Sequence, residues 1–388
     1  MSEKLHINTL FVLPQLARGG SETLVYNLAR MMDRSKFNPS VSYLRHEGDR
    51  DFINEFERNN IKVYSAPKRS NFDFGLMRKL AGIIEKDNIK IINAHHFISM
   101  VYSFYACKRN KNVRLVYTEH STWEIDCIPL KWRIIGSYLL NHLDAITTVT
   151  DEIALAIQKK FFLRGPRIMT IKNGIDLNRF NLSHNKTFIR DSIGIEPDSI
   201  VIGMVANFRK IKNHMLLLKV FKYLLSQYSG LKLILVGQGF TDDPENSEED
   251  IRGFVQNNDM NENVIFTGFR RDIPELLAIM DIFCLTSFNE GLPISLIEAM
   301  AAGLPVVGTN VAGIRDVIKS GFNGFLVDFF SFDKLQNALR ALLDNKEMRV
   351  TFGNNSRVLA TESFSLRFCV DRYQDLFQRL YYNLTDNA

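Results

Sequence analysis

The chain has 388 residues, of which 46% are hydrophobic and 23% charged, so it is long enough for two domains with packed cores. Its four cysteines show no CxxC or Cys/His spacing, which argues against a zinc site or a disulfide framework and suits a reducing cytoplasm. Residues 1–175 contain 26 Lys and Arg against 17 Asp and Glu, and this excess favours an anionic partner, unless it is ordinary scatter of surface charge.

Apolar runs of strand length alternate with segments of helical periodicity along the whole chain. The N-terminus has a short apolar run after an acidic position, which predicts a first strand and not a signal peptide. In the first half, strands are expected at 7–13, 38–44, 61–66, 89–96, 113–120 and 145–150, and helices at 21–32 and 75–86. In the second half, strands are expected at 199–208, 231–237, 263–268, 281–287, 305–310 and 324–327, and helices at 214–227, 273–280 and 294–302.

This alternation predicts an α/β fold with two parallel, doubly wound Rossmann-like sheets. The polar segment 176–191 is the expected linker, because the pattern restarts near Ser199. We therefore expect domains at 1–177 and 178–365 and a C-terminal helical segment at 366–388. Ligands bind beyond the carboxyl ends of the strands in such sheets, so two domains facing one another would form a cleft with one substrate on each side.

Two features of the first half lie at predicted strand ends. Gly19 and Gly20 follow the first strand and precede a helix, where a loop without side chains lets the backbone approach a phosphate or a sugar closely. His120 ends a later strand, and this position favours a ligand contact over a purely structural role.

The second half places basic residues at the end of its first strand. Arg209 can bind a diphosphate through two parallel hydrogen bonds and Lys212 can act as a point charge, although a solvated basic turn would have the same sequence. Gly237 and Gly239 form a GxG at the next strand end. This signal is weak on its own, because it also suits a tight turn.

The segment 288–307, FNEGLPISLIEAMAAGLPVV, contains two glutamates in an apolar run. Pro293 suits the first position of a helix and Gly303 its C-terminal stop, which puts Glu290 on the preceding loop and Glu298 inside the helix. A carboxylate pairs well with vicinal hydroxyls, and the helix N-terminus between the two acids is an anion site. The pattern suggests a sugar nucleotide; a capped helix with solvent-exposed acids is the alternative.

Taken together, these motifs resemble those of family-four retaining glycosyltransferases with the GT-B fold. The matching segments are GGSE at 19–22, TEH at 118–120, NGID at 173–176, NFRKIKNH at 207–214, LVGQG at 235–239, TGFRRD at 267–272, the segment 288–307, AGIRD at 312–316 and GFNGFLV at 321–327. The resemblance spans nearly the whole chain, and the two glutamates with their EAMA-x-G-x-P continuation are its most specific part. It implies transfer of a sugar from a nucleotide sugar, with UDP as the expected nucleotide, retention at the anomeric carbon, and no metal ion or other cofactor.

The resemblance also implies roles for individual residues. As catalytic residues we expect His120 beside the donor sugar, Glu290 facing that sugar, and Arg209 and Lys212 on the diphosphate. Glu298 is expected to bind the ribose hydroxyls. The other expected donor-binding positions are Gly19, Gly20, Asn173, Asn207, Gly237, Phe269, Arg270, Gly291 and Leu292.

Within that set, the backbone of Gly291 and Leu292 is expected near the sugar and phosphates, and the backbone of Phe269 and Arg270 near the base. Many members of the family have an arginine where this chain has Asn207, which leaves open which basic residue holds the diphosphate.

Two other functions are compatible with the same architecture. A sugar-nucleotide epimerase would need acid–base residues around the sugar, and the paired glutamates argue against it. An inactive partner subunit would lack donor-binding residues, which are present here. Nucleic-acid binding is not expected, because the basic excess belongs to no recognised nucleic-acid-binding module.

The acceptor is expected to be lipid-linked or a glycan, in polysaccharide or glycoconjugate biosynthesis. The stretch 129–140, PLKWRIIGSYLL, places Trp132 beside two basic residues, which suits a membrane interface, and no segment is apolar enough to span one. A basic cluster precedes it, formed by Lys108, Arg109, Lys111 and Arg114. We expect a cytoplasmic enzyme that is peripheral at the inner face of the cell membrane; a buried helix and a soluble acceptor are the alternative.

The C-terminal helix predicted within 363–384 either returns to the first domain, as in GT-B proteins, or packs in a local core.

Overall fold

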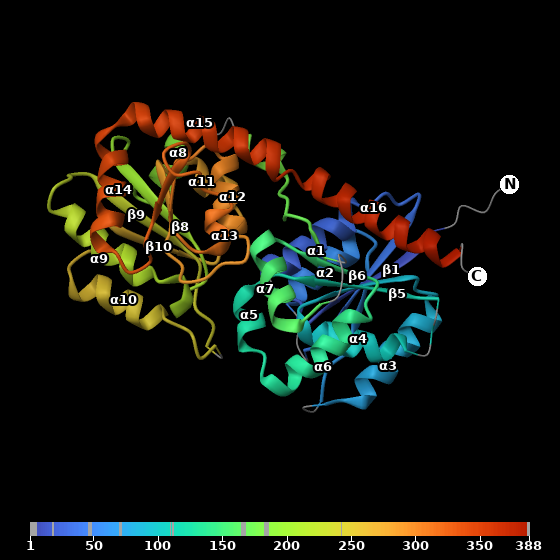
Figure 1. Ribbon diagram of the computed structural model, residues 1–388. Helices are drawn as coiled ribbons and strands as arrows, with labels where there is room; N and C mark the ends of the chain where they lie inside the picture. The colour runs from blue at the N-terminus through green and yellow to red at the C-terminus, as the bar shows by residue number, and fades with distance from the viewer. Residues whose placement is uncertain are drawn as a thin grey trace. The chain divides into compact units, whose positions relative to one another are not determined.

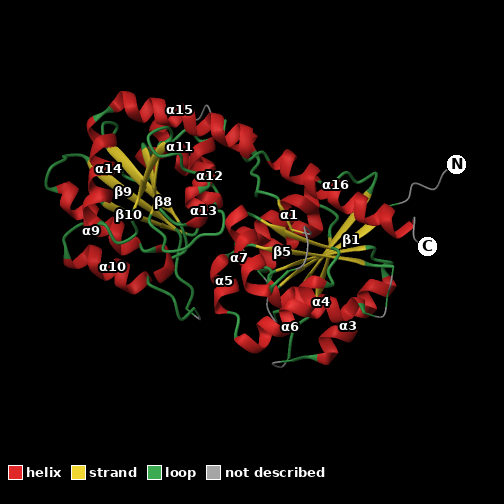
Figure 2. Cartoon of the chain, in the orientation of Figure 1, coloured by secondary structure: helices red, strands yellow, loops and turns green. Residues whose placement is uncertain are grey.

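The computed structural model describes residues 6–17, 19–45, 49–69, 72–108, 110, 112–163, 168–181, 186–241 and 243–385. The chain forms two compact units (Figures 1 and 2). One unit comprises residues 1–174 and 366–388, and the other comprises residues 175–365. The passage into the second unit falls just before the predicted boundary after residue 177.

The first unit contains a seven-stranded parallel sheet with the strand order β3-β2-β1-β4-β5-β6-β7. Its strands are β1 (Ile7–Leu13), β2 (Phe37–Tyr43), β3 (Lys62–Ser65), β4 (Ile91–His95), β5 (Arg114–Glu119), β6 (Ala145–Thr148) and β7 (Ile168–Thr170). Its helices are α1 (Gly20–Met31), α2 (Arg50–Arg58), α3 (Phe74–Lys86), α4 (Phe97–Cys107), α5 (Thr122–Cys127), α6 (Leu130–Asn141), α7 (Asp151–Phe161) and α16 (Leu366–Thr385). The strand order reverses between β1 and β4, and ligands bind beyond the carboxyl ends of strands at such a switch point.

The second unit contains a six-stranded parallel sheet with the order β10-β9-β8-β11-β12-β13. Its strands are β8 (Ile200–Val205), β9 (Leu231–Val236), β10 (Val264–Gly268), β11 (Ile282–Leu285), β12 (Val306–Thr309) and β13 (Gly324–Val327). Its helices are η1 (Leu177–Phe180), α8 (Lys186–Ser192), η2 (Lys210–Lys212), α9 (His214–Leu225), α10 (Glu248–Asn257), α11 (Ile273–Ala278), α12 (Ile294–Ala301), α13 (Ala312–Arg315), α14 (Phe332–Asp344) and α15 (Lys346–Ser363). Here the strand order reverses between β8 and β11.

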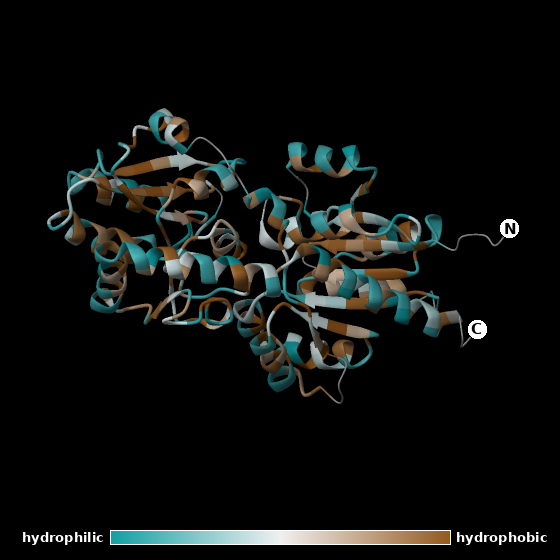
Figure 3. Cartoon of the chain, turned by 90° about the horizontal axis from the view of Figure 1, so that it is seen from above, coloured by the Kyte–Doolittle hydropathy of each residue, from teal (hydrophilic) through white to brown (hydrophobic). Residues whose placement is uncertain are grey.

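Apolar strands form both cores because helices cover both faces of a parallel sheet. The five residues of β4 and the four of β11 are all buried, and most strands of both sheets are brown in Figure 3. Side-chain caps fix several helix starts. Asp49 accepts a hydrogen bond from Phe52 N at the start of α2, and Asp73 accepts one from Leu76 N at the start of α3.

The last helix, α16, completes the core of the first unit. Its buried residues join the apolar cluster built on β1, β2, α1 and α2, and they are Leu366, Cys369, Val370, Tyr373, Leu376, Phe377 and Tyr381. The ring of Phe377 lies 6.2 Å from that of Phe11 on β1, measured between centroids. The helix therefore returns to the first unit and is part of its hydrophobic core.

Some elements differ from the sequence expectation. The predicted strand at 89–96 ends at His95, because His96 adopts a positive φ of 67° and precedes α4. Helix α12 starts at Ile294, and Pro293 is its N-cap rather than its first residue. Among the described residues, no helix is both long enough and apolar enough to cross a membrane.

Candidate active site

In the second unit, Lys212 and Glu290 meet at the switch point of the sheet. Lys212 lies in η2 after β8, and Glu290 lies in the loop after β11. Lys212 Nζ donates to Glu290 Oε1 at 2.7 Å, and Ser287 Oγ donates to the same oxygen at 2.6 Å. Glu290 is buried, and these two donors compensate for the loss of its hydration. The structure thus brings together two of the four predicted catalytic residues.

The loop around Glu290 is held close to a neighbouring helix. The carbonyl of Glu290 accepts a hydrogen bond from Gly313 N at 3.3 Å. A Cβ atom on Gly313 would lie 1.8 Å from the carbonyl oxygen of Gly291, so only glycine allows this approach. Leu292, the next residue, is buried. The backbone predicted to meet the sugar and phosphates is therefore fixed just ahead of α12.

Glu298 lies half-buried in α12, between the buried residues Ile297 and Ala299. Burial raises the pKa of its carboxyl group to about 7, and the charge of Arg179 in η1 opposes this shift. A carboxyl group with such a pKa gains from hydrogen-bond donors that stabilise its ionised form, and vicinal hydroxyls are donors of this kind.

Two predicted arginines each pair with an aspartate. Arg209 Nε lies 2.6 Å from Asp243 Oδ2. Arg270 binds Asp272 through both Nε, at 2.7 Å, and Nη2, and this pairing lowers the pKa of the Asp272 carboxyl. An anionic ligand would have to replace a carboxylate at either arginine. Beside Arg270, the side chain of Phe269 is 44% exposed.

Asn207 and Gly237 lie at the ends of β8 and β9. The carbonyl of Asn207 accepts a hydrogen bond from Arg209 N at 2.8 Å, so it shapes the turn that carries the basic residues. Gly237 has φ 142°, and a Cβ atom there would lie 2.1 Å from the carbonyl oxygen of Ala206. This glycine allows the two strand ends to approach closely.

In the first unit, the two predicted glycines lie at the carboxyl end of β1. Gly19 is the N-cap of α1 and Gly20 its first residue. A Cβ atom on Gly19 would lie 2.5 Å from Glu22 Oε2, an oxygen that accepts a hydrogen bond from Ser21 Oγ at 2.8 Å. The Glu22 carboxylate therefore packs against the backbone of Gly19 at the N-terminus of α1, a contact that a side chain at position 19 would block.

His120 follows β5, and its Nε2 atom lies 2.8 Å from Nδ1 of His95 at the end of β4. Burial lowers the pKa of both imidazoles well below the usual value, and the charge of the nearby His96 acts in the same direction. Both rings are therefore neutral at pH 7. His95, in turn, lies 3.0 Å from Asn93 Oδ1 through its Nε2 atom.

His96 carries the positive charge of this cluster. Its Nδ1 atom lies 2.8 Å from Glu124 Oε1, and its Nε2 atom lies 2.9 Å from Ser21 Oγ. Burial alone would lower the pKa of His96, but the hydrogen bond to Glu124 and the charges of Glu124, Glu119 and Glu22 outweigh burial and raise it to about 9. The end of β4 thus presents an imidazolium among three acidic residues.

His96, Glu119 and Glu124 have the chemistry of metal ligands, with ligand atoms within 4.8 Å of one another. Both nitrogens of His96 already have partners, and a histidine with a pKa of about 9 holds its proton in competition with a metal at pH 7. Glu119 accepts hydrogen bonds from the Tyr117 hydroxyl and from the backbone N–H of His120. This bonding fits a charged hydrogen-bond network better than a metal site.

Asn173 is a buried residue near the end of the first unit. Among the described residues, none is hydrogen-bonded to its side-chain oxygen. A buried amide oxygen without a partner is uncommon in folded proteins and is consistent with a ligand contact. No described hydrogen bond joins it to the other predicted residues.

Sequence reasoning missed several residues that surround the predicted ones. Asn93, His95 and His96 adjoin His120 and the α1 N-terminus, and Ser287 adjoins Glu290. A signal existed for the first three, because NAHH ends a predicted strand in the same way as TEH. Neither Ser287 nor the pairing of Arg209 with Asp243 carries a comparable signal.

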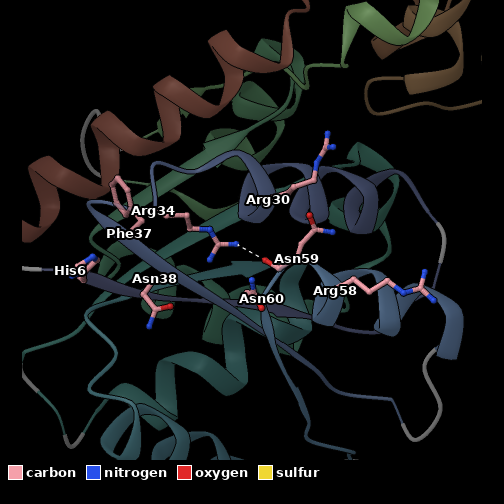
Figure 4. Close-up of a pocket in the computed structure, with 8 residues that line it drawn as sticks. All are labelled: His6, Arg30, Arg34, Phe37, Asn38, Arg58, Asn59 and Asn60. Atoms are coloured by element: carbon pink, nitrogen blue, oxygen red, sulfur yellow. Dashed lines mark hydrogen bonds between the residues drawn. The ribbon is translucent and has the colours of Figure 1, made fainter.

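A separate pocket of about 810 Å³ lies at the amino ends of β1 and β2 (Figure 4). It is lined by His6, Arg30, Arg34, Phe37, Asn38, Arg58, Asn59 and Asn60. Arg34 Nη2 donates to Asn59 O at 3.2 Å, as the dashed line in Figure 4 shows. None of the predicted site residues lines this pocket, which lies at the sheet edge opposite the carboxyl ends of the strands.

Comparison with protein families decides the class of protein. The model "Glycosyltransferase Family 4" matches residues 18–179, and "Glycosyl transferases group 1" matches residues 185–359. The chain belongs to these glycosyltransferase families. The family resemblance drawn from the sequence is thereby confirmed, and the epimerase alternative finds no support.

Two curated bacterial relatives share about a quarter of their residues with this glycosyltransferase. N-acetyl-alpha-D-glucosaminyl L-malate synthase of Bacillus anthracis is 27% identical over 335 residues, which are 83% of each chain. UDP-Gal:alpha-D-GlcNAc-diphosphoundecaprenol alpha-1,3-galactosyltransferase of Escherichia coli is 26% identical over 325 residues, covering 82% of this chain and 78% of the relative.

Solved structures confirm the fold of this glycosyltransferase. Anabaena HepE in complex with UDP-glucose superimposes with a TM-score of 0.85 at 20% identity, covering 96% of this chain and 100% of that chain. A glycosyltransferase from Rickettsia africae gives a TM-score of 0.85 at 17% identity, covering 97% and 98%. The predicted GT-B architecture of two Rossmann-like units with a returning C-terminal helix is correct.

Proposed function

We propose that this glycosyltransferase moves a sugar from a UDP-sugar to a hydroxyl group of a lipid-linked or glycan acceptor, with retention at the anomeric carbon. The observation that carries the proposal is the Lys212–Glu290 pair at the β8–β11 switch point, directly ahead of the helix that contains Glu298. The E. coli relative supports the donor and acceptor classes through its name, and the Anabaena complex supports a UDP-sugar.

In this proposal, the ribose of the donor is bound by a carboxylate and its diphosphate by two cations. Glu298 accepts hydrogen bonds from the ribose hydroxyls, as its half-buried position in α12 and its raised pKa favour. The cations of Arg209 and Lys212 stabilise the diphosphate, and each now neutralises a carboxylate that the donor would replace or share. Exchanging one anion for another keeps these cations paired and limits the cost of binding.

Transfer breaks the bond between the anomeric carbon and the phosphate oxygen and forms a bond to the acceptor oxygen on the same face. The acceptor proton passes to the departing phosphate oxygen, so no separate base is required. Positive charge develops on the sugar and negative charge on the diphosphate. Lys212 and Arg209 are fixed by their ion pairs before reaction, and such preorganised charges are an effective source of stabilisation.

The test is turnover with a panel of sugar nucleotides, followed by NMR identification of the product. We expect UDP-sugars to be consumed in preference to GDP- and dTDP-sugars, and the anomeric configuration of the donor to be kept in the product. Transfer with inversion, or no consumption of any UDP-sugar in the presence of acceptor extracts, would contradict the proposal.

We expect turnover to be independent of divalent metal ions. Lys212 and Arg209 supply the positive charge that a metal would otherwise provide, and the His96 cluster is better suited to holding a proton. The measurement is the initial rate of sugar transfer after exhaustive dialysis against EDTA, compared with untreated enzyme. A rate that disappears with EDTA and returns with Mg²⁺ or Mn²⁺ would refute this expectation.

We also propose that the first unit binds the surface of an anionic membrane through helices α6 and α7. Large apolar side chains are exposed there, namely Leu130, Ile134 and Tyr138 on α6, Leu155 on α7 and Phe162 just after it. We call these five residues the α6–α7 apolar surface. Leu130, Ile134 and Phe162 also line a groove of about 700 Å³ together with the basic residues Arg133, Lys159 and Lys160 and one acid, Asp126, which pairs with Lys160 at 3.0 Å. Apolar residues flanked by basic ones match a lipid surface with negative headgroups.

The residues proposed here for membrane contact differ from those expected from the sequence. Trp132 is half-buried, with its ring 6.3 Å from that of Phe72, so it faces the protein. Arg114 pairs with Asp144 at 3.1 Å. Lys108 is exposed, and the remaining two members of the predicted basic cluster, at 109 and 111, lie outside the described residues.

Sedimentation with anionic vesicles tests the membrane proposal. We expect binding at low salt that weakens as salt rises, since screening reduces attraction between charges. Ile134→Glu combined with Lys159→Glu should abolish binding. The matched control is Arg34→Glu with Arg58→Glu in the pocket of Figure 4, which changes charge on another part of the first unit. Absence of vesicle binding at low salt, or an equal loss of vesicle binding in both double variants, would contradict a specific role of the α6–α7 apolar surface.

A further inference from the structure

A chain of buried polar groups lies behind His120 and has no part in the mechanism above. It runs from Asn93 through His95 to His120, at the carboxyl ends of β4 and β5. His95 Nε2 lies 3.0 Å from Asn93 Oδ1, and His95 Nδ1 lies 2.8 Å from His120 Nε2. The two imidazole planes differ by 20° and their centroids are 5.1 Å apart, which fits two rings meeting edge to edge through these nitrogens.

Neighbouring groups fix the orientation of the Asn93 amide. Its nitrogen lies 3.5 Å from Val116 O and donates to Thr118 Oγ1 at 2.8 Å. A backbone carbonyl can only accept, so this placement, with the amide nitrogen towards Val116 O and the amide oxygen towards His95, keeps two acceptor oxygens from facing one another. An amide oxygen also only accepts. His95 must therefore carry its proton on Nε2.

The protonation of His95 then determines that of His120. His95 is neutral because burial and the charge of His96 lower its pKa, so its Nδ1 atom has a lone pair and accepts. His120 must donate to it and carries a proton on Nε2. His120 is neutral as well, so its other nitrogen, Nδ1, also has a lone pair. Among the described residues, none is hydrogen-bonded to this nitrogen.

We propose that Asn93 and His95 are positioning residues that hold His120 as its Nε2–H tautomer, so that His120 Nδ1 is a hydrogen-bond acceptor for a substrate hydroxyl group. The part concerning substrate rests on the proposed function and on the family resemblance, which implies that His120 lies beside the donor sugar. The ionisable groups around it are His96 and the acids Glu22, Glu119 and Glu124. His96 holds the proton that these acids attract, which leaves His120 free to accept.

The tautomer can be measured without any turnover assay. The full chain, labelled with ¹⁵N-histidine, is examined by NMR at pH 7, and the His120 signals are assigned by their loss in His120→Gln. We expect a protonated Nε2 and an unprotonated Nδ1 in His120, and the same pattern in His95. A proton on His120 Nδ1, or on both of its nitrogens, would overturn the proposal.

Asn93→Asp tests the connection to catalysis. A carboxylate facing His95 Nε2 stabilises the imidazolium form of His95, whose Nδ1–H then donates to His120 and moves the His120 proton to Nδ1. We expect the NMR pattern of His120 to reverse and kcat/KM to fall about tenfold, the scale of one hydrogen bond. Asn323→Asp is the matched control, because Asn323 is also fully buried but lies in the second unit and accepts from Lys319 N. It should alter neither readout.

The outcomes separate the two proposals. A reversed tautomer with unchanged kcat/KM would show that substrate does not use His120 Nδ1, and this would overturn the inference. Wild-type enzyme that consumes no UDP-sugar would refute the proposed function, while the NMR pattern would still decide whether Asn93 and His95 set the tautomer.

Discussion

Lys212→Ala is expected to lower kcat for sugar transfer by about 10²–10³-fold, the scale of losing one preorganised charge that stabilises a developing anion. Lys212 reaches the loop after β11, with its ammonium group 2.7 Å from Glu290 Oε1. The measurement is single-turnover transfer from a saturating UDP-sugar, so that weaker binding does not mask the chemical step. We expect a smaller change in KM than in kcat.

The ion pair itself complicates this substitution, because Ser287 would be the one side-chain partner left to Glu290 within the described part of the chain. Removing one member of a buried pair destabilises the protein through the charge left behind. Lys212→Met combined with Glu290→Gln removes both charges and should recover most of the lost free energy of unfolding, but not the activity. Near-normal kcat in this double variant would mean that the pair is only structural.

Glu298→Ala is expected to weaken the binding of UDP by about 1.5–3 kcal/mol, or roughly 10- to 150-fold, the range for a hydrogen bond to a charged group. The position inside α12, with buried neighbours on both sides, leaves few other groups to replace the carboxylate. Isothermal titration calorimetry with the folded variant measures this directly. Unchanged affinity would remove Glu298 from the donor site.

Glu298→Gln supplies the matched control, because it keeps the size and one acceptor oxygen but cannot ionise. The wild-type carboxyl has a pKa of about 7, above its ordinary value of 4.5, so the ligand-free protein holds this proton more tightly than the unfolded chain does. The raised pKa of Glu298 therefore adds to the free energy of unfolding. This added stability is complete below pH 4.5 and is lost as the pH rises towards 7. Uridine, which has no phosphate to titrate, should bind the wild-type protein more tightly as the pH rises through 7, and Glu298→Gln should not show this change.

Much of the fold follows from periodicity in the sequence. Buried parallel strands are continuous apolar runs, and β1, β8 and β11 were therefore visible together with the helices between them. The passage of α16 back to the first unit is different in kind. The apolar spacing of α16 is compatible with packing on either unit. Long-range packing against β1 and α1 determines that it completes the core of the first unit.

The candidate site was predictable where residues follow strands in sequence, as Glu290 and His120 do. The hydrogen-bond partners of these residues could not be predicted, because they depend on the order of the strands in the sheet. The strand ending at His95 pairs with the strand ending beside His120, and this neighbour relation brings two imidazoles within 2.8 Å. In the same way, η2 and the loop after β11 meet because β8 and β11 are adjacent, although 78 positions separate Lys212 from Glu290.

The packing of α16 constrains the order in which the protein can form during synthesis. Residues 175–365 are a continuous stretch and can fold as soon as they leave the ribosome. The first unit, although its sheet is made earlier, cannot bury Phe11 and its neighbours until residues 366–385 have been translated. The part of the chain that is made first is therefore completed last, and its exposed apolar strands must be kept from aggregation during the translation of the whole second unit.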